Sequence, residues 1–195
     1  MMKRDWTNIT LKDWYEMQDI LAVQDEWTMY NLLDYLYDID SSSMPISEVK
    51  KYNLGFLADT TALDNYKIDK SYDEKYDINL DITNLSVAQF IDFQNYSKET
   101  EPRFEKLVSC FIFPKGHTYN DGYDIKEVQN DILNWPFAMV KKISFFLTKQ
   151  LQTFISLTLY YLKAEMEKME IPKNKELSSL MEKIISLNSE LCHTS

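Results

Sequence analysis

Apolar side chains recur every three or four positions through most of the chain, which is the spacing of one face of an α-helix. Leu11, Trp14 and Met17 begin the first such run, and Thr10 stands before it as an N-cap, so we expect a helix over residues 11–23. Similar spacing predicts further helices over about residues 27–37, 45–57, 86–96, 104–112 and 124–135. The pattern therefore favours a mainly helical chain.

Residues that cap helices stand before several of these runs. Ser86 and Gln89 have the S-x-x-Q spacing of a capping box, and Asp124 and Glu127 repeat it before the run that starts at Ile125. We therefore expect Asp124 to act as a helix cap, which explains its presence without a chemical role.

Residues 66–85 break the helical pattern. Apolar residues alternate with polar ones, and a polar stretch, SYDEK, divides the alternation into two runs. We expect one β-hairpin here. It either covers a face of the helices or offers an exposed edge to a partner strand.

The chain ends in a predicted αα-hairpin. Little interrupts the helical pattern over residues 136–170, and Pro172 then introduces a last helix with a full apolar stripe. We expect residues 1–171 to form one helical domain and residues 172–195 to pack back on the long helix. The alternative is a docking arm, whose partner-binding residues would be Leu177, Leu180, Met181, Ile184 and Ile185.

The stretch SCFIFPKGHTYNDGYDIKEV, residues 109–128, gathers candidate chemistry. It holds two of the three glycines and one of the two histidines, His117, close to Asp121. The acidic residues lack the alternating spacing of a calcium loop, and no second histidine or pair of cysteines lies near for zinc. No nucleophile motif frames His117. We interpret the stretch as a turn between helices and expect no catalytic residue, metal or cofactor.

Charge and composition narrow the classes of partner. The net charge of −10 opposes nucleic-acid phosphates, so no nucleic acid is expected as a partner. Residues 143–162 are long and apolar enough to raise the question of a membrane span, but Lys149 near their middle argues against it. The two cysteines fit no metal spacing and suit reduced thiols in a cytoplasm. The class that remains is an acidic α+β protein, a multi-helix bundle with one hairpin.

Much of the chain also resembles a family of proteins from tailed phages that infect gut Bacteroidetes. The most specific piece is FPKGHTYNDGYDI, residues 113–125. The other matching pieces are TLKDWYEMQDIL (10–21), PISEVKKYNLGFL (45–57), LSVAQFIDFQNYSK (85–98) and SFFLTKQLQTFISLTLYYL (144–162). The resemblance implies a tail assembly chaperone or a small virion-associated protein, without a catalytic residue.

Three function classes follow. The first is a phage assembly protein that binds phage structural or tail proteins in the host cytoplasm, with a minor structural protein of the virion as its variant and a homo-oligomer left open. The second is an acidic inhibitor of host defence that imitates nucleic acid, but the acidic residues are spread over every segment instead of one face. The third is an enzyme, which no motif favours.

Overall fold

The computed structural model describes residues 5–52, 54–99, 103–119 and 121–168. The chain is mainly helical with one two-stranded antiparallel sheet, which confirms the predicted fold class. The elements in chain order are α1 (Leu11–Val23), α2 (Thr28–Tyr37), η1 (Ser41–Ser43), α3 (Ile46–Val49), η2 (Gly55–Ala58), α4 (Thr61–Asp64), β1 (Tyr76–Ile78), η3 (Ile82–Asn84), α5 (Val87–Ser97), α6 (Phe104–Ser109), β2 (Ile112–Pro114), α7 (Ile125–Ile132) and α8 (Phe137–Lys168).

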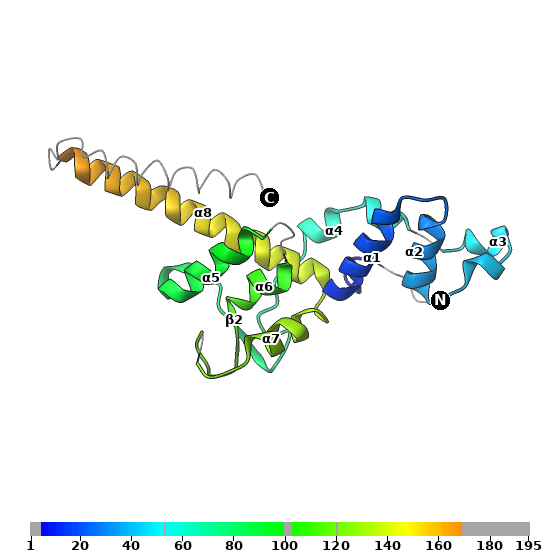
Figure 1. Ribbon diagram of the computed structural model, residues 1–195, viewed down its shortest axis with the longest axis horizontal. Helices are drawn as coiled ribbons and strands as arrows, with labels where there is room; N and C mark the ends of the chain where they lie inside the picture. The colour runs from blue at the N-terminus through cyan, green and yellow to red at the C-terminus, as the bar shows by residue number, and fades with distance from the viewer. Residues whose placement is uncertain (1–4, 53, 100–102, 120, 169–195) are drawn as a thin grey trace.

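Helix α8 is the longest of the described helices, and its two halves differ in burial. The first half crosses the body, where Met139, Ile143 and Leu147 are fully buried against α6 and α1. The second half projects beyond the body, as Figure 1 shows for the yellow and orange turns. The helix predicted over residues 136–170 is confirmed over Phe137–Lys168, and residues 169 and 170 lie outside the described residues. The predicted last helix, and with it the αα-hairpin, lies outside the described residues.

The N-terminal segment is fastened to the start of α8. Phe137 N donates to Ile9 O at 2.8 Å, and Leu11 N donates to Trp135 O at 2.9 Å. The Trp14 ring stacks on the Phe137 ring with centroids 4.3 Å apart. These contacts place α1 against the first turn of α8, and α2 and α3 follow at the far end of the molecule from the projecting half (Figure 1).

The sheet joins segments that are far apart in sequence. β1 pairs with β2 so that Tyr76 faces Pro114 and Ile78 faces Ile112. The predicted strand at Tyr76 is thus present, but the local hairpin over residues 66–85 is wrong, because residues 66–70 form no strand. Residues 112 and 113 are both buried, so β2 gives β1 a more apolar partner than the polar 66–70 run could.

Two predicted helices are shorter in the structure. The run over residues 104–112 ends as a helix at Ser109, and Ile112 already belongs to β2. Residues 110–113 are all buried, so the helical period does not continue, and Pro114 cannot donate a helical hydrogen bond. The helix predicted over residues 45–57 is only α3 followed by η2. No side chain of α3 is buried, so packing does not support a longer helix.

The predicted N-caps of α1, α5 and α7 are confirmed. Thr10 and Asp13 form a reciprocal capping box, as do Ser86 and Gln89. Asp124 caps α7 by accepting a hydrogen bond of 2.9 Å from Lys126 N, and not through the predicted capping box with Glu127. Such caps satisfy backbone donors that the first helical turn leaves free, which is why these boundaries can be predicted from sequence.

Candidate protein-binding surfaces

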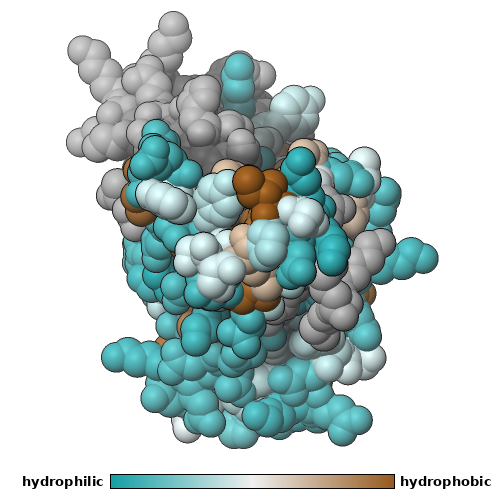
Figure 2. All heavy atoms as spheres, turned by 90° about the vertical axis from the view of Figure 1, so that its right-hand side faces the viewer, coloured by the Kyte–Doolittle hydropathy of each residue, from teal (hydrophilic) through white to brown (hydrophobic). Residues whose placement is uncertain are grey.

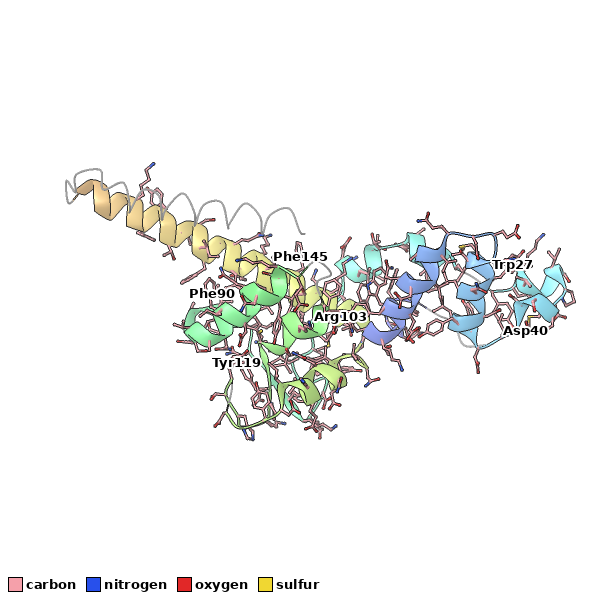
Figure 3. All side chains as sticks on the ribbon, viewed as in Figure 1. Trp27, Asp40, Phe90, Arg103, Tyr119 and Phe145 are labelled. Carbon is pink, nitrogen blue, oxygen red and sulfur yellow. The ribbon has the colours of Figure 1, made fainter. Side chains whose placement is uncertain are left out.

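A row of apolar side chains lies exposed on the projecting half of α8. Phe154, Leu157 and Tyr161 follow the i, i+3, i+7 spacing of one helix face, and Tyr160 lies beside them. Nearer the body, Phe145 is also exposed (Figure 3). We call the first four residues the α8 row. Large aromatic and aliphatic side chains gathered in this way are typical of surfaces that bind another protein.

A second apolar surface lies at the other end of the molecule. An open hollow of about 330 Å³ lies between α2 and α3, and we call it the α2–α3 hollow. Figure 2, which looks at this end, shows a small hydrophobic patch surrounded by hydrophilic surface. The hollow is lined by Trp27, Tyr30, Ser41, Ser42, Met44, Ile46, Val49 and Lys50.

Local hydrogen bonds hold the backbone at Trp27, one of the residues that line the hollow. Asp25 Oδ1 accepts from Trp27 N at 2.9 Å, while Thr28 Oγ1 accepts from Asp25 N at the same distance. The Trp27 and Tyr30 rings lie 5.8 Å apart. Trp27 is nevertheless 54% exposed. An exposed aromatic side chain on a backbone that is held in place is well suited to anchor a partner, since less conformational entropy is lost on binding.

Three carboxylates lie next to residues that line the hollow. Asp25 accepts from Trp27 N, Asp34 accepts from Ser41 N and Asp40 accepts from Ser42 Oγ, while Lys50 is the charged residue within the lining. Asp40 precedes two lining serines, and hydrogen bonds from Ser42 and Ser43 lower the pKa of its carboxyl. Asp40 therefore stays ionised over a wide range of pH. Figure 3 places Trp27 and Asp40 at this same end of the molecule.

One residue that lines the hollow, Ser41, has a buried polar atom without a partner among the described residues. Ser41 is 4% exposed, and its Oγ forms no hydrogen bond with any described residue. The Ser41 backbone N is satisfied by Asp34 Oδ1 at 2.7 Å. A buried hydroxyl without a partner costs about 1–3 kcal/mol, so such an atom is unusual in a folded protein.

The loop that contains His117 and Asp121 connects β2 to α7. It was predicted to be a turn between two helices, but the element before it is a strand. His117 Nδ1 lies 3.0 Å from the backbone oxygen of Asp121, and both side chains are open to solvent. Gly116 and Gly122 have φ of +80° and +74°, values that favour glycine. Among the described residues, no three His, Cys, Asp or Glu side chains are grouped as metal ligands.

The described cysteine is buried rather than reactive. Burial raises the pKa of the Cys110 thiol to about 12. The thiol therefore stays protonated at neutral pH, and a protonated thiol is a poor nucleophile and metal ligand.

The predicted partner-binding residues and the surfaces that the structure exposes are different sets. Leu177, Leu180, Met181, Ile184 and Ile185 lie outside the described residues. The α2–α3 hollow was missed, because the sequence pattern places Trp27 and Tyr30 on the apolar face of a helix that begins at Trp27. In the structure α2 begins at Thr28, and both rings are exposed. The acidic residues Asp25 and Glu26, directly before Trp27, were the available signal that this position is exposed, because charged side chains are almost never fully buried.

Comparisons with protein families, with curated proteins and with solved structures found no match. In the part of the chain that the structure describes, no helix has the length and apolar character needed to cross a membrane.

Proposed function

We propose that the protein is a phage assembly protein that acts by binding other proteins, and that it is a tail assembly chaperone. The observation that carries the proposal is the α8 row. It puts two tyrosines, a phenylalanine and a leucine on a helix that projects from the body. The sequence resemblance to tailed-phage proteins supplies the class of partner.

The chemistry of a tail assembly chaperone fits these features. Such a protein has to cover apolar segments of tail subunits and later release them. Binding through an exposed apolar row provides the cover, while the net charge of −10 keeps the free protein and its complexes soluble. The same row would serve a minor structural protein of the virion, which is the alternative.

The proposal is tested by capture of phage tail proteins. The full chain is co-expressed with the tail-tube and tape-measure proteins of its own genome, and the complex is isolated through a tag. Leu157→Asp is expected to abolish capture, because it places a charge in the centre of the row. Val87→Asp is the matched control, since Val87 is an apolar residue that is 75% exposed but belongs to α5 instead of α8.

Equal capture by Leu157→Asp and Val87→Asp would contradict binding through the row. Mass spectrometry of purified virions then separates the two variants of the proposal. A chaperone is absent from the finished particle, whereas a structural component is present in it.

A further inference from the structure

We propose that the α2–α3 hollow binds a basic segment of a partner protein, which inserts one bulky apolar side chain between Trp27 and Ile46. The inference rests on the proposed function for the nature of the partner, a protein. It uses a surface other than the α8 row, so the two can be tested separately.

The residues that line the hollow favour a large apolar side chain as the group that is inserted. Trp27, Ile46 and Val49 are apolar, and Ile46 is 72% exposed. A volume of about 330 Å³ is at the lower end of the range of ligand pockets, about 300–1,000 Å³. An open, mainly apolar hollow of this size fits one large side chain of a protein partner, in the way that binding hot spots are usually built.

The charges around the hollow favour basic residues beside that apolar side chain in the partner. The carboxylates of Asp25, Asp34 and Asp40, each hydrogen-bonded to a residue that lines the hollow, attract a segment that carries lysine or arginine beside its apolar anchor. Asp40, which stays ionised, stands next to the lining residues Ser41 and Ser42. Lys50 also lines the hollow, and its ammonium group would pair with a single acidic residue of the partner.

Ser41 is one of the lining residues, and its Oγ is buried without a hydrogen-bond partner among the described residues. The floor of the hollow at Ser41 is therefore closed, and the hollow offers an apolar contact and an attractive charge at one place.

The first experiment uses synthetic helical peptides of about 18 residues, made of leucine and lysine with one phenylalanine in the apolar face. Binding to the full chain is measured by calorimetry and by the fluorescence of Trp27, the exposed tryptophan. The lysine peptide is expected to bind and to shift the emission to shorter wavelength, as the ring becomes covered. A peptide with glutamate in place of lysine is expected not to bind.

The second experiment separates the hollow from the general attraction of a basic peptide to an acidic protein. Ile46→Asp is compared with Val87→Asp. Both residues are the first of a helix, and they are 72% and 75% exposed. Ile46→Asp is expected to raise the Kd about tenfold or more, the usual effect of losing a hot-spot contact, while Val87→Asp leaves it within about twofold.

Three results would overturn the inference: no binding of the lysine peptide, equal binding of the glutamate peptide, or equal effects of Ile46→Asp and Val87→Asp. Circular dichroism and thermal melting establish that both variants are folded. Leu157→Asp, which tests the proposed function, should leave peptide binding unchanged. Failure of the α8 row is thereby distinguished from failure of the hollow.

Discussion

Tyr15 and Glu105, 90 residues apart in sequence, share a hydrogen bond of 2.7 Å in which the tyrosine hydroxyl donates to Oε2. The same hydroxyl accepts from Phe104 N at 2.8 Å. Glu105 is only 5% exposed, and its second oxygen accepts from Arg103 Nε at 2.7 Å. The Arg103 guanidinium also lies over the Tyr15 ring, 4.4 Å from its centroid. This cluster fastens α1 to the beginning of α6.

Replacing Tyr15 by phenylalanine is expected to lower the free energy of unfolding by about 1–3 kcal/mol. The variant leaves Glu105 and Phe104 N, both in the same cluster, with one hydrogen bond fewer, and Glu105 is too buried for water to replace it freely. Urea unfolding measures the change. Tyr161→Phe, on the exposed α8 row, is the control and should stay within about 0.5 kcal/mol of the unaltered protein. Equal effects would contradict the prediction.

Stability is expected to fall as the pH rises above about 10, the ordinary pKa of tyrosine. Burial, followed by the hydrogen bonds to Glu105 and Asp92, raises the pKa of Tyr15 and Tyr119. Above pH 10 the unfolded chain releases these protons while the folded chain retains them, so unfolding becomes more favourable. Urea midpoints between pH 9 and 11 measure the slope. Tyr119→Phe should make the slope shallower; an unchanged slope would show that Tyr119 does not contribute.

At acid pH the relevant group is Asp131. The hydrogen bond from Tyr76, followed by the contact with Lys75, lowers the pKa of this carboxyl in the folded state. Its contribution is therefore fully present at neutral pH and is lost as the pH falls below about 4, through the folded pKa. Asp131→Asn should reduce the difference in stability between pH 7 and pH 3. Tyr76→Phe, which removes the main hydrogen-bond donor to Asp131, should reproduce part of that reduction. If neither variant changes the difference in stability between pH 7 and pH 3, Asp131 does not contribute to it.

The loop between β2 and α7 should respond as a structural turn. Asp124→Ala is expected to lower stability by about 0.5–2 kcal/mol, because the cap on Lys126 N is lost. His117→Ala and Asp121→Ala should leave folding and partner binding essentially unchanged, since both side chains are exposed. Thermal melts of the three variants provide the measurement. Metal bound at stoichiometric occupancy in the purified protein would contradict the interpretation as a turn.

The last predicted helix, outside the described residues, can be tested by deletion. If residues 173–195 pack back on α8, a chain that ends at Pro172 should aggregate or bind a hydrophobic dye, because apolar surface is uncovered. If they form a docking arm, the shortened chain should stay soluble and lose only partner binding. We expect the first result. A thermal melt identical to that of the full chain would move the binding site to Leu177, Leu180, Met181, Ile184 and Ile185.

Helix bounds that depend on interactions between residues close in sequence could be predicted from the sequence. The bounds of α1 follow from Thr10 and the apolar period after it, and the start of α5 follows from Ser86 and Gln89. These features act within one helical turn, so the sequence alone reveals them. The full length of α8 could be expected for the same reason.

Long-range pairing could not be predicted in this way. The alternation around Tyr76 indicated a strand but not its partner, which comes from beyond Phe111. The hollow depends on two separate segments, one with Trp27 and one with Ile46, and on which apolar residues remain uncovered after packing. A single periodic pattern does not contain that information, because an exposed tryptophan and a buried one look alike in sequence.

The antiparallel bridge between Thr10 and Pro136 has a consequence for the timing of folding during synthesis. The start of α1 is completed by hydrogen bonds from and to residues that the ribosome adds more than a hundred positions later. Until Trp135 and Phe137 have emerged, Ile9 O and Leu11 N lack their partners, and Trp14 has no ring to stack on. Closing so long a loop is slow, so the nascent N-terminal half keeps apolar surface exposed until then, and molecular chaperones of the cell would bind it in that interval.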